Sequence, residues 1–406
     1  MSPSRHLHAT DLRGAARLAT EATAGLADLV EAMHAGIATV PGLQAAPADG
    51  RTGGLTGLVY KTVRGVTRLV GGSVDALLGL LEPALERGAA TPEREAVVAA
   101  LNGVLGDHLV ATGNPLATTM SFRHQGRALS LEPAALAREL PDAGEHLLLL
   151  VHGLCMNDLQ WARKGHDHGA ALARDLGCTA VYLNYCSGQH VSLNGRALAQ
   201  QLQALVEAWP RPLASLTIVG HSMGGLVARS ALHQAQSAGL GWTQALRRMV
   251  FLGTPHHGAP LERAGNGVDV LLELTRYTAP FARLGQLRSA GITDLRHGNL
   301  LDEDWSGSGR FARGADRRLP VPLPSGVACY ALAATIGEQP GALQQNWVGD
   351  GLVPLDSGLG RHADASRALG FAPDRQWVAP DTGHLDLLSS PQVYAQLRRW
   401  LAEPLP

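Results

Sequence analysis

From about residue 117 onward, short apolar segments alternate with amphipathic helical segments, and this alternation restricts the fold more than any other feature. Residues 146–151 form a short continuous apolar run, which is typical of a strand buried on both faces of a sheet. Parallel strands need crossover connections, so the order predicts a mostly parallel sheet flanked by helices. The predicted strands are 118–123, 127–131, 146–151, 179–185, 216–220, 248–253, 327–334 and 375–379, and the predicted helices are 169–176, 195–209, 223–238 and 392–401.

The first part of the chain has a different pattern. Apolar residues recur at helical spacing over residues 11–38 and 55–81, and a third helical segment follows between 92 and 111. No catalytic constellation is visible among these residues. We therefore expect an α-helical region at 1–115 and a second domain at 116–406.

A long segment between Pro260 and Pro324 contains no strand-like run, only short helical patterns and a polar stretch. It is too long for a simple connection between strands, so it is either a cap or a disordered insertion. Apolar residues in its first half, such as Val268 and Leu271, favour a helical cap over residues 261–326.

The composition excludes several classes of function. The formal net charge is −1 over 406 residues, so the chain has no basic surface for nucleic acid. No run approaches the ~18 apolar residues of a membrane-spanning helix, and the N-terminus lacks the layout of a signal peptide. We therefore expect a soluble, cytoplasmic protein. The four cysteines have no metal-binding or C-x-x-C spacing, which predicts reduced and mostly buried thiols: Cys155, Cys178, Cys186 and Cys329.

One serine lies in the sequence context of a nucleophile. The segment Gly220-His221-Ser222-Met223-Gly224 fits G-x-S-x-G and lies between a predicted strand and a predicted helix. A serine on so tight a turn adopts strained backbone angles, and small residues two positions before and after it avoid clashes. The N-terminus of the following helix favours a developing anion, so we expect Ser222 to be the nucleophile.

The backbone donors that stabilise such an anion are predicted from the same context. One donor follows the nucleophile, and the other lies in the loop after residues 146–151. This assigns the N–H groups of Leu154 and Met223. His152 either touches the substrate or hydrogen-bonds to the loop backbone, and we favour the second role.

The general base is expected beyond the last predicted strand, because the order of this kind of triad is Ser, acid, His. His384 lies between that strand and the final helix and is our candidate. His256 and His257 follow the strand after the serine, so they compete for this role or line the pocket.

The acid is expected between residue 334 and His384. Asp350 lies in a turn-forming stretch that can aim a carboxylate at the imidazole, and Asp356 is the alternative. The full set of candidates is Asp350, Asp356, Asp364, Asp374 and Asp381.

From about residue 117 to 406 the chain resembles the alpha/beta-hydrolase superfamily. It is most similar to bacterial lipases and esterases and to the lipase-like group related to GPI inositol deacylases. The shared motifs are HGL at 152–154, GHSMGG at 220–225, GTPHHG at 253–258, GDGLVP at 349–354 and GHLDLL at 383–388. The resemblance implies an α/β alpha/beta-hydrolase fold with a helical cap insertion and an N-terminal α-helical extension. It also implies a Ser222–Asp350–His384 triad, an oxyanion hole at Leu154 and Met223, and hydrolysis of a carboxylic ester through an acyl-enzyme, without a cofactor. We expect the substrate pocket to include His152, Gly153, His221, His256 and His257.

Two segments contain residue types that ligate metals, and neither predicts a metal site. Some bacterial lipases bind calcium near the catalytic histidine, and Asp386 matches one ligand position, but no matching acidic residue lies upstream of Asp350. Lys164-Gly165-His166-Asp167-His168 lacks helix-face ligand spacing and is interpreted as a polar loop or helix start.

The resulting hypothesis is an esterase or lipase that acts on small-molecule or lipid esters with apolar acyl groups. The same triad also fits an acyltransferase or an intracellular polyester hydrolase. A third interpretation, of another class, makes the N-terminal helices a lipid-surface binding module, because residues 55–81 combine an apolar stripe with basic residues. We favour packing of that stripe on the hydrolase domain or on a second subunit.

Overall fold

The computed structural model describes residues 9–38, 91–259, 289–306, 316, 318–337 and 349–403, together with the isolated positions 61, 63, 65 and 75. Contacts divide the chain into two units, one of Met1–Arg94 and Leu109–Ala117 and one of Glu95–His108 and Thr118–Pro406. Most of the predicted helix 55–81, and the helical patterns predicted in the first half of the cap, lie outside the described residues.

The first unit contains α1, Ala9–Ala38, which confirms the helix predicted over 11–38. Arg13 and Arg17 of this helix donate to the carboxylate of Asp75 at 2.8 and 2.6 Å. Arg94 likewise pairs with Asp11 at 2.7 Å. None of the described helices is long and apolar enough to cross a membrane.

The predicted third helix is α3, Pro92–Ala111, and the hydroxyl of Thr91 caps it by accepting from the N–H of Arg94 at 3.3 Å. Residues Glu95–His108 of this helix belong to the second unit.

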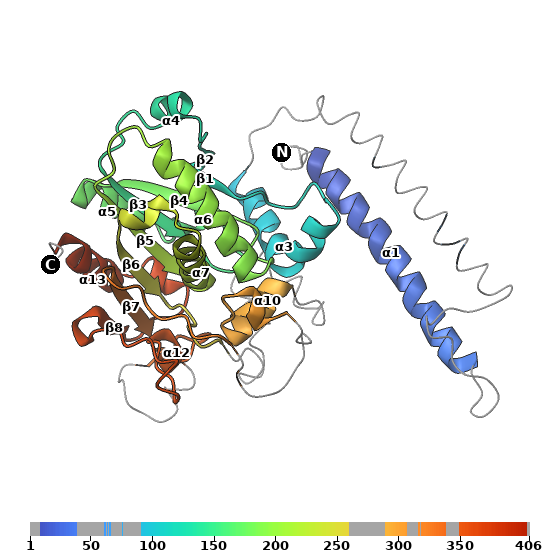
Figure 1. Cartoon of the computed structure of the whole chain (residues 1–406). Coiled ribbons are helices and arrows are strands. Elements are labelled where there is room, and N and C mark those ends of the chain that lie inside the picture. Colours follow the sequence, from blue (N-terminus) through green and yellow to red (C-terminus); the bar gives the residue numbers. More distant parts are fainter. Residues whose placement is uncertain are drawn as a thin grey trace. The chain divides into compact units, whose positions relative to one another are not determined.

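The second unit is built on an eight-stranded sheet with the order β2-β1-β4-β3-β5-β6-β7-β8 (Figure 1). Strands β3 to β8 pair in parallel, while β1 pairs antiparallel with β2 and β4. The mostly parallel sheet predicted from the sequence is therefore confirmed. The strands are β1 Ser121–His124, β2 Arg127–Ala128, β3 His146–Val151, β4 Thr179–Asn184, β5 Ser215–His221, β6 Leu246–Leu252, β7 Ala328–Ala334 and β8 Gln376–Ala379.

Helices cover both faces of this sheet, and alternate side chains of each strand supply the two apolar layers. Leu147 and Leu149 of β3 join the layer that contains α6 and α7, whereas Leu148 and Leu150 join the layer that contains α5 and α13. Both layers are thus filled by one continuous apolar strand. The helices of this unit, besides α3, are α4 Pro133–Glu139, α5 His168–Leu176, α6 Val191–Glu207, α7 Met223–Ser237, α10 Ala290–His297, α12 Leu355–Gly358 and α13 Pro391–Ala402.

Within the predicted cap, the structure describes α10 and the segments around it. This helix begins at Ser289, whose hydroxyl accepts from the N–H of Ile292 at 3.2 Å, and ends at Gly298 in the left-handed region with φ 72°. The four cysteines are free, and Cys155, Cys186 and Cys329 are buried. Burial raises the pKa of the Cys155 thiol to about 12, so it is a packing residue.

Candidate active site

Ser222 connects the central strand β5 to α7. Its backbone has φ 54° and ψ −124°, a strained conformation for a residue with a side chain, and its N–H donates to the carbonyl of Leu252 at 2.8 Å. Gly224 allows the turn to approach the neighbouring loop, since a Cβ there would lie 2.6 Å from the carbonyl oxygen of His152. The predicted strand-to-helix turn is thus present, with the serine at its apex.

Asp350 and His384 form a buried pair. The Nδ1 of His384 lies 2.7 Å from the Oδ2 of Asp350, and both side chains are at most 3% exposed. The other oxygen of this carboxylate accepts from the N–H groups of Leu352 at 3.0 Å and Val353 at 2.8 Å. Because an ionised carboxylate only accepts, the proton of His384 is on Nδ1 and its Nε2 is left as an acceptor.

Among the sequence candidates for the acid, Asp350 is the residue that contacts His384. Asp356 instead lies 3.4 Å from the guanidinium of Arg361 at an exposed position. Asp364 accepts from the N–H and hydroxyl of Ser366. The structure therefore brings together two of the three predicted triad residues by direct contact.

His221 links the serine turn to this pair. Its Nε2 donates to the backbone carbonyl of His384 at 3.2 Å, and the two ring centroids lie 4.8 Å apart. Gly253, at the end of β6, lies beside the pair, since a Cβ there would be 3.1 Å from Asp350 Oδ2 and 3.2 Å from His384 Cε1. Ser222 follows β5 and Gly253 follows β6, so the serine and the pair lie at the carboxyl edge of the parallel strands, where ligands bind in sheets of this type.

The loop after β3 runs beside the serine. A Cβ on Gly153 would lie 3.0 Å from the Cβ of Ser222, so the loop that contains Leu154 runs close to this serine. The Tyr185 hydroxyl donates to the carbonyl of His152 at 2.8 Å, and the His152 Nδ1 donates to the carbonyl of Gly153 at 2.8 Å. These bonds fix the loop. Met223 is the first residue of α7, so its N–H belongs to the donors that a helix leaves without intrahelical partners.

His152 and His221 are interior residues. They are 0% and 1% exposed, and the His152 ring stacks on Tyr185 with centroids 4.4 Å apart. Burial lowers the pKa of His152 to about 4, so its ring is neutral at physiological pH. The backbone-bonding role that the sequence favoured for His152 matches these contacts.

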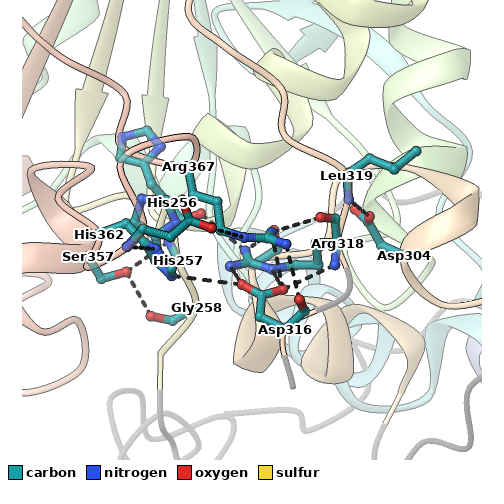
Figure 2. A network of polar contacts seen from close by, with 12 residues as sticks. His256, His257, Gly258, Asp304, Asp316, Arg318, Leu319, Ser357, His362 and Arg367 are labelled. Atoms are coloured by element: carbon teal, nitrogen blue, oxygen red, sulfur yellow. Dashed lines mark hydrogen bonds and ion pairs between the residues drawn. The ribbon is translucent and has the colours of Figure 1, made fainter. Parts of the chain in front are cut away.

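His256 and His257 lie in a polar network that includes Ser357 of α12. The N–H of His256 donates to the carbonyl of Ser357 at 3.2 Å, and the N–H of His257 donates to the Ser357 hydroxyl at 3.1 Å. Figure 2 shows Arg318, Arg367 and His362 gathered around the carboxylate of Asp316 in the same network. The loop after β6 is therefore tied both to α12 and to the end of the predicted cap.

Sequence reasoning missed several residues that hold the site. Tyr185 and Ser187 follow β4 and support the loop after β3, and Arg229 of α7 donates to His256 Nδ1 at 3.3 Å. Tyr185 ends a predicted strand, and this position indicates a residue at the carboxyl edge of the sheet. Its hydrogen-bond partner is a backbone carbonyl, which no sequence pattern identifies.

The segment 164–168 supports the turn that follows His384. Asp167 caps α5 by accepting from the N–H of Ala170 at 3.0 Å, which confirms the predicted helix start. The Nε2 of His168 donates to the carbonyl of Leu387 at 2.9 Å. Lys164 Nζ lies 2.7 Å from Asp386 Oδ1, so an ammonium group neutralises the carboxylate that had been considered as a calcium ligand.

Residues 144–315 match a family model described as the PGAP1-like alpha/beta domain. No curated protein matches the chain. Among solved structures, the chain is similar to the mature lipase BlEst2 of Bacillus licheniformis, with 17% identity, a TM-score of 0.41 and coverage of 70% of this chain and 98% of that one. It is also similar to Aspergillus fumigatus lipase B, with 12% identity, a TM-score of 0.41 and coverage of 72% of this chain and 58% of that one. An esterase of Pyrococcus furiosus has 11% identity and a TM-score of 0.39, with coverage of 65% of this chain and 84% of that one. The chain has the alpha/beta-hydrolase fold that its lipase-like motifs predicted, and within that fold it is similar to the PGAP1-like alpha/beta domain.

Proposed function

We propose that this protein is a serine carboxylester hydrolase that acts through an acyl-enzyme on esters with apolar acyl groups. The proposal rests chiefly on the buried 2.7 Å contact between Asp350 and His384, placed at the same sheet edge as the strained serine turn. A carboxylate that orients an imidazole near such a serine is the arrangement that nucleophilic acyl transfer requires.

In the proposed mechanism, Nε2 of His384 takes the proton of Ser222 as the hydroxyl oxygen attacks the ester carbonyl. The N–H groups of Leu154 and Met223 hold the oxyanion, and His384 then protonates the leaving alcohol. Water, activated by the same imidazole, hydrolyses the acyl-enzyme. Asp350 remains ionised throughout, because it keeps the proton of the imidazole on Nδ1 and stabilises the imidazolium.

Ester turnover by Ser222→Ala beside the wild type tests the proposal. With p-nitrophenyl esters of increasing chain length, we expect the variant to lose at least about 10³-fold in kcat. Ser237→Ala is the matched control, because this serine ends the same helix at an exposed position and donates to the carbonyl of His233. Retained turnover in Ser222→Ala would overturn the assignment, and activity on acetyl esters alone would contradict the apolar acyl preference.

An acyltransferase would use the same residues, so only the acceptor separates the two reactions. Product analysis with an added alcohol should give free acid as the main product. If the new ester is the main product, the proposed reaction is acyl transfer to the alcohol and not hydrolysis.

A further inference from the structure

Helix α3 packs two glycines against loops of the second unit. Gly103 and Gly106 lie one turn apart on the same face of the helix. A Cβ on Gly103 would overlap the Cys155 sulfur and lie 2.8 Å from the Cα and 2.9 Å from the N of the same residue. Real Cβ atoms essentially never come this close, so the Gly103 position requires glycine.

Cys155 immediately follows Leu154, and it is held from two sides. Its N–H donates to the Ser187 hydroxyl at 3.1 Å, and its sulfur contacts the carbonyl of Ala100 in α3 at 3.8 Å. Its backbone adopts φ 60°, in the left-handed region that residues with side chains seldom occupy. The surrounding contacts must therefore impose this conformation.

The helix itself is fixed by further contacts, so it cannot simply move away from a larger side chain. A Cβ on Gly106 would overlap the Cys186 sulfur and lie 3.1 Å from the Cα of Gly188. The Ser289 hydroxyl donates to the carbonyl of Gly103 at 2.7 Å, and the Ala290 N–H donates to the Asp107 carboxylate at 3.0 Å. A methyl group added at Gly103 would thus displace Cys155.

We propose that Gly103 is a positioning residue of the oxyanion hole: the face of α3 against Cys155 sets where the Leu154 N–H points. This inference rests on the proposed function, in which that N–H binds the oxyanion. An oxyanion donor is effective only about 2.7–3.1 Å from the charged oxygen, and a misplacement of about 1 Å can cost about 10²-fold in rate. The role adds no chemistry of its own, since Gly103 acts through Cys155.

Gly14→Ala is the matched control for Gly103→Ala, because it also replaces a helix glycine whose Cβ would overlap a neighbouring side chain, here that of Leu116 in the first unit. We expect Gly103→Ala to lower kcat by about 10- to 100-fold with KM changed by less than about threefold. Gly14→Ala should leave kcat within about threefold, even if it lowers the melting temperature as much as Gly103→Ala does. Equal effects of the two variants on kcat would overturn the proposal.

Ser187→Ala covers the case in which Gly103→Ala does not fold, because it removes the acceptor of the Cys155 N–H without adding an atom. It should lower kcat by about tenfold, and Ser187→Thr, which keeps the hydroxyl, should restore most of the loss. An unchanged kcat in Ser187→Ala would contradict the proposal.

Hydrogen exchange separates the positioning role from the proposed function. Amides of residues 152–157 should exchange faster in Gly103→Ala, whereas in Gly14→Ala the faster exchange should be confined to the residues around Leu116. This selectivity is expected even if the wild type hydrolyses no ester, a result that would overturn only the function. Uniformly faster exchange, or none, would overturn the positioning role.

Discussion

Replacing Asp350 by asparagine tests the catalytic role proposed for the Asp350–His384 pair with little change in shape. Two of the three bonds made by this carboxylate go from the N–H groups of Leu352 and Val353 to Oδ1, and an amide oxygen can accept both. The third bond runs from His384 Nδ1 to Oδ2, where the asparagine would present an N–H group. Two donors cannot pair, so the imidazole proton moves to Nε2, which can then no longer accept the serine proton.

The catalytic loss should exceed the loss of stability. In a serine enzyme, turning the triad carboxylate into an amide lowers kcat by about 10⁴, which corresponds to about 5 kcal/mol in the activation free energy. In the folded state a hydrogen bond to a charged group, worth about 1.5–3 kcal/mol, is replaced by a neutral one from the asparagine N–H to Nδ1, so the loss of stability is smaller than this value. We therefore expect Asp350→Asn to remain folded at 25 °C while kcat falls by about 10³ to 10⁴.

The assay is steady-state hydrolysis of the best p-nitrophenyl ester, with urea unfolding of the same preparation. Asp356→Asn is the control, because Asp356 belongs to the same segment, is exposed and pairs with Arg361. It should retain kcat within about threefold, as is usual for a surface pair. A kcat for Asp350→Asn within tenfold of the wild type would refute the role given to this carboxylate. A large loss of kcat in Asp356→Asn would assign that role to Asp356.

Three further predictions concern the residues around the site. Burial lowers the pKa of both His152 and His168 to about 4, so between pH 6.5 and 4 the unfolded chain binds protons that the folded chain does not. The free energy of unfolding should fall as pH decreases through this window, by up to about 1.4 kcal/mol per pH unit for each histidine. Urea unfolding at pH 7 and pH 5 measures this loss, which should be smaller in His168→Gln than in the wild type. A free energy of unfolding that is the same at both pH values would contradict the prediction. Tyr185→Phe leaves the His152 carbonyl without its donor and should cost about 1–3 kcal/mol in the free energy of unfolding, measured in urea. Lys164→Met breaks an exposed pair with Asp386, so it should change that free energy by less than about 1 kcal/mol, and a larger loss in the same measurement would show that the pair holds the turn after His384.

Local patterns predicted the parts of the fold that depend on local physics. The apolar run at 146–151 and the small residues around Ser222 constrain the backbone within a few positions, so the strand and the turn follow from the sequence. The contact of Asp350 with His384 was also anticipated, since chain order and a turn-forming segment left few candidates.

Contacts between distant segments were not predictable in this way. Nothing in the sequence shows that Cys155 occupies the space that a side chain at position 103 would fill. The helix α10 was missed although Ser289 and Gly298 are good cap residues, since its own apolar residues are few. The packing of α3 on the loop after β3 likewise depends on tertiary structure.

The strand order also distributes the proposed catalytic groups unevenly between the middle and the edge of the sheet. Ser222 follows β5, which has neighbours on both sides, whereas His384 follows β8, a four-residue strand that ends the order of the described strands beside β7 and is largely half-buried. Edge strands open at a lower free energy than central ones. Heat or denaturant should therefore displace His384 first, while Ser222 and most of the core remain native. Inactivation should then precede global unfolding and be reversible for as long as only this edge has opened.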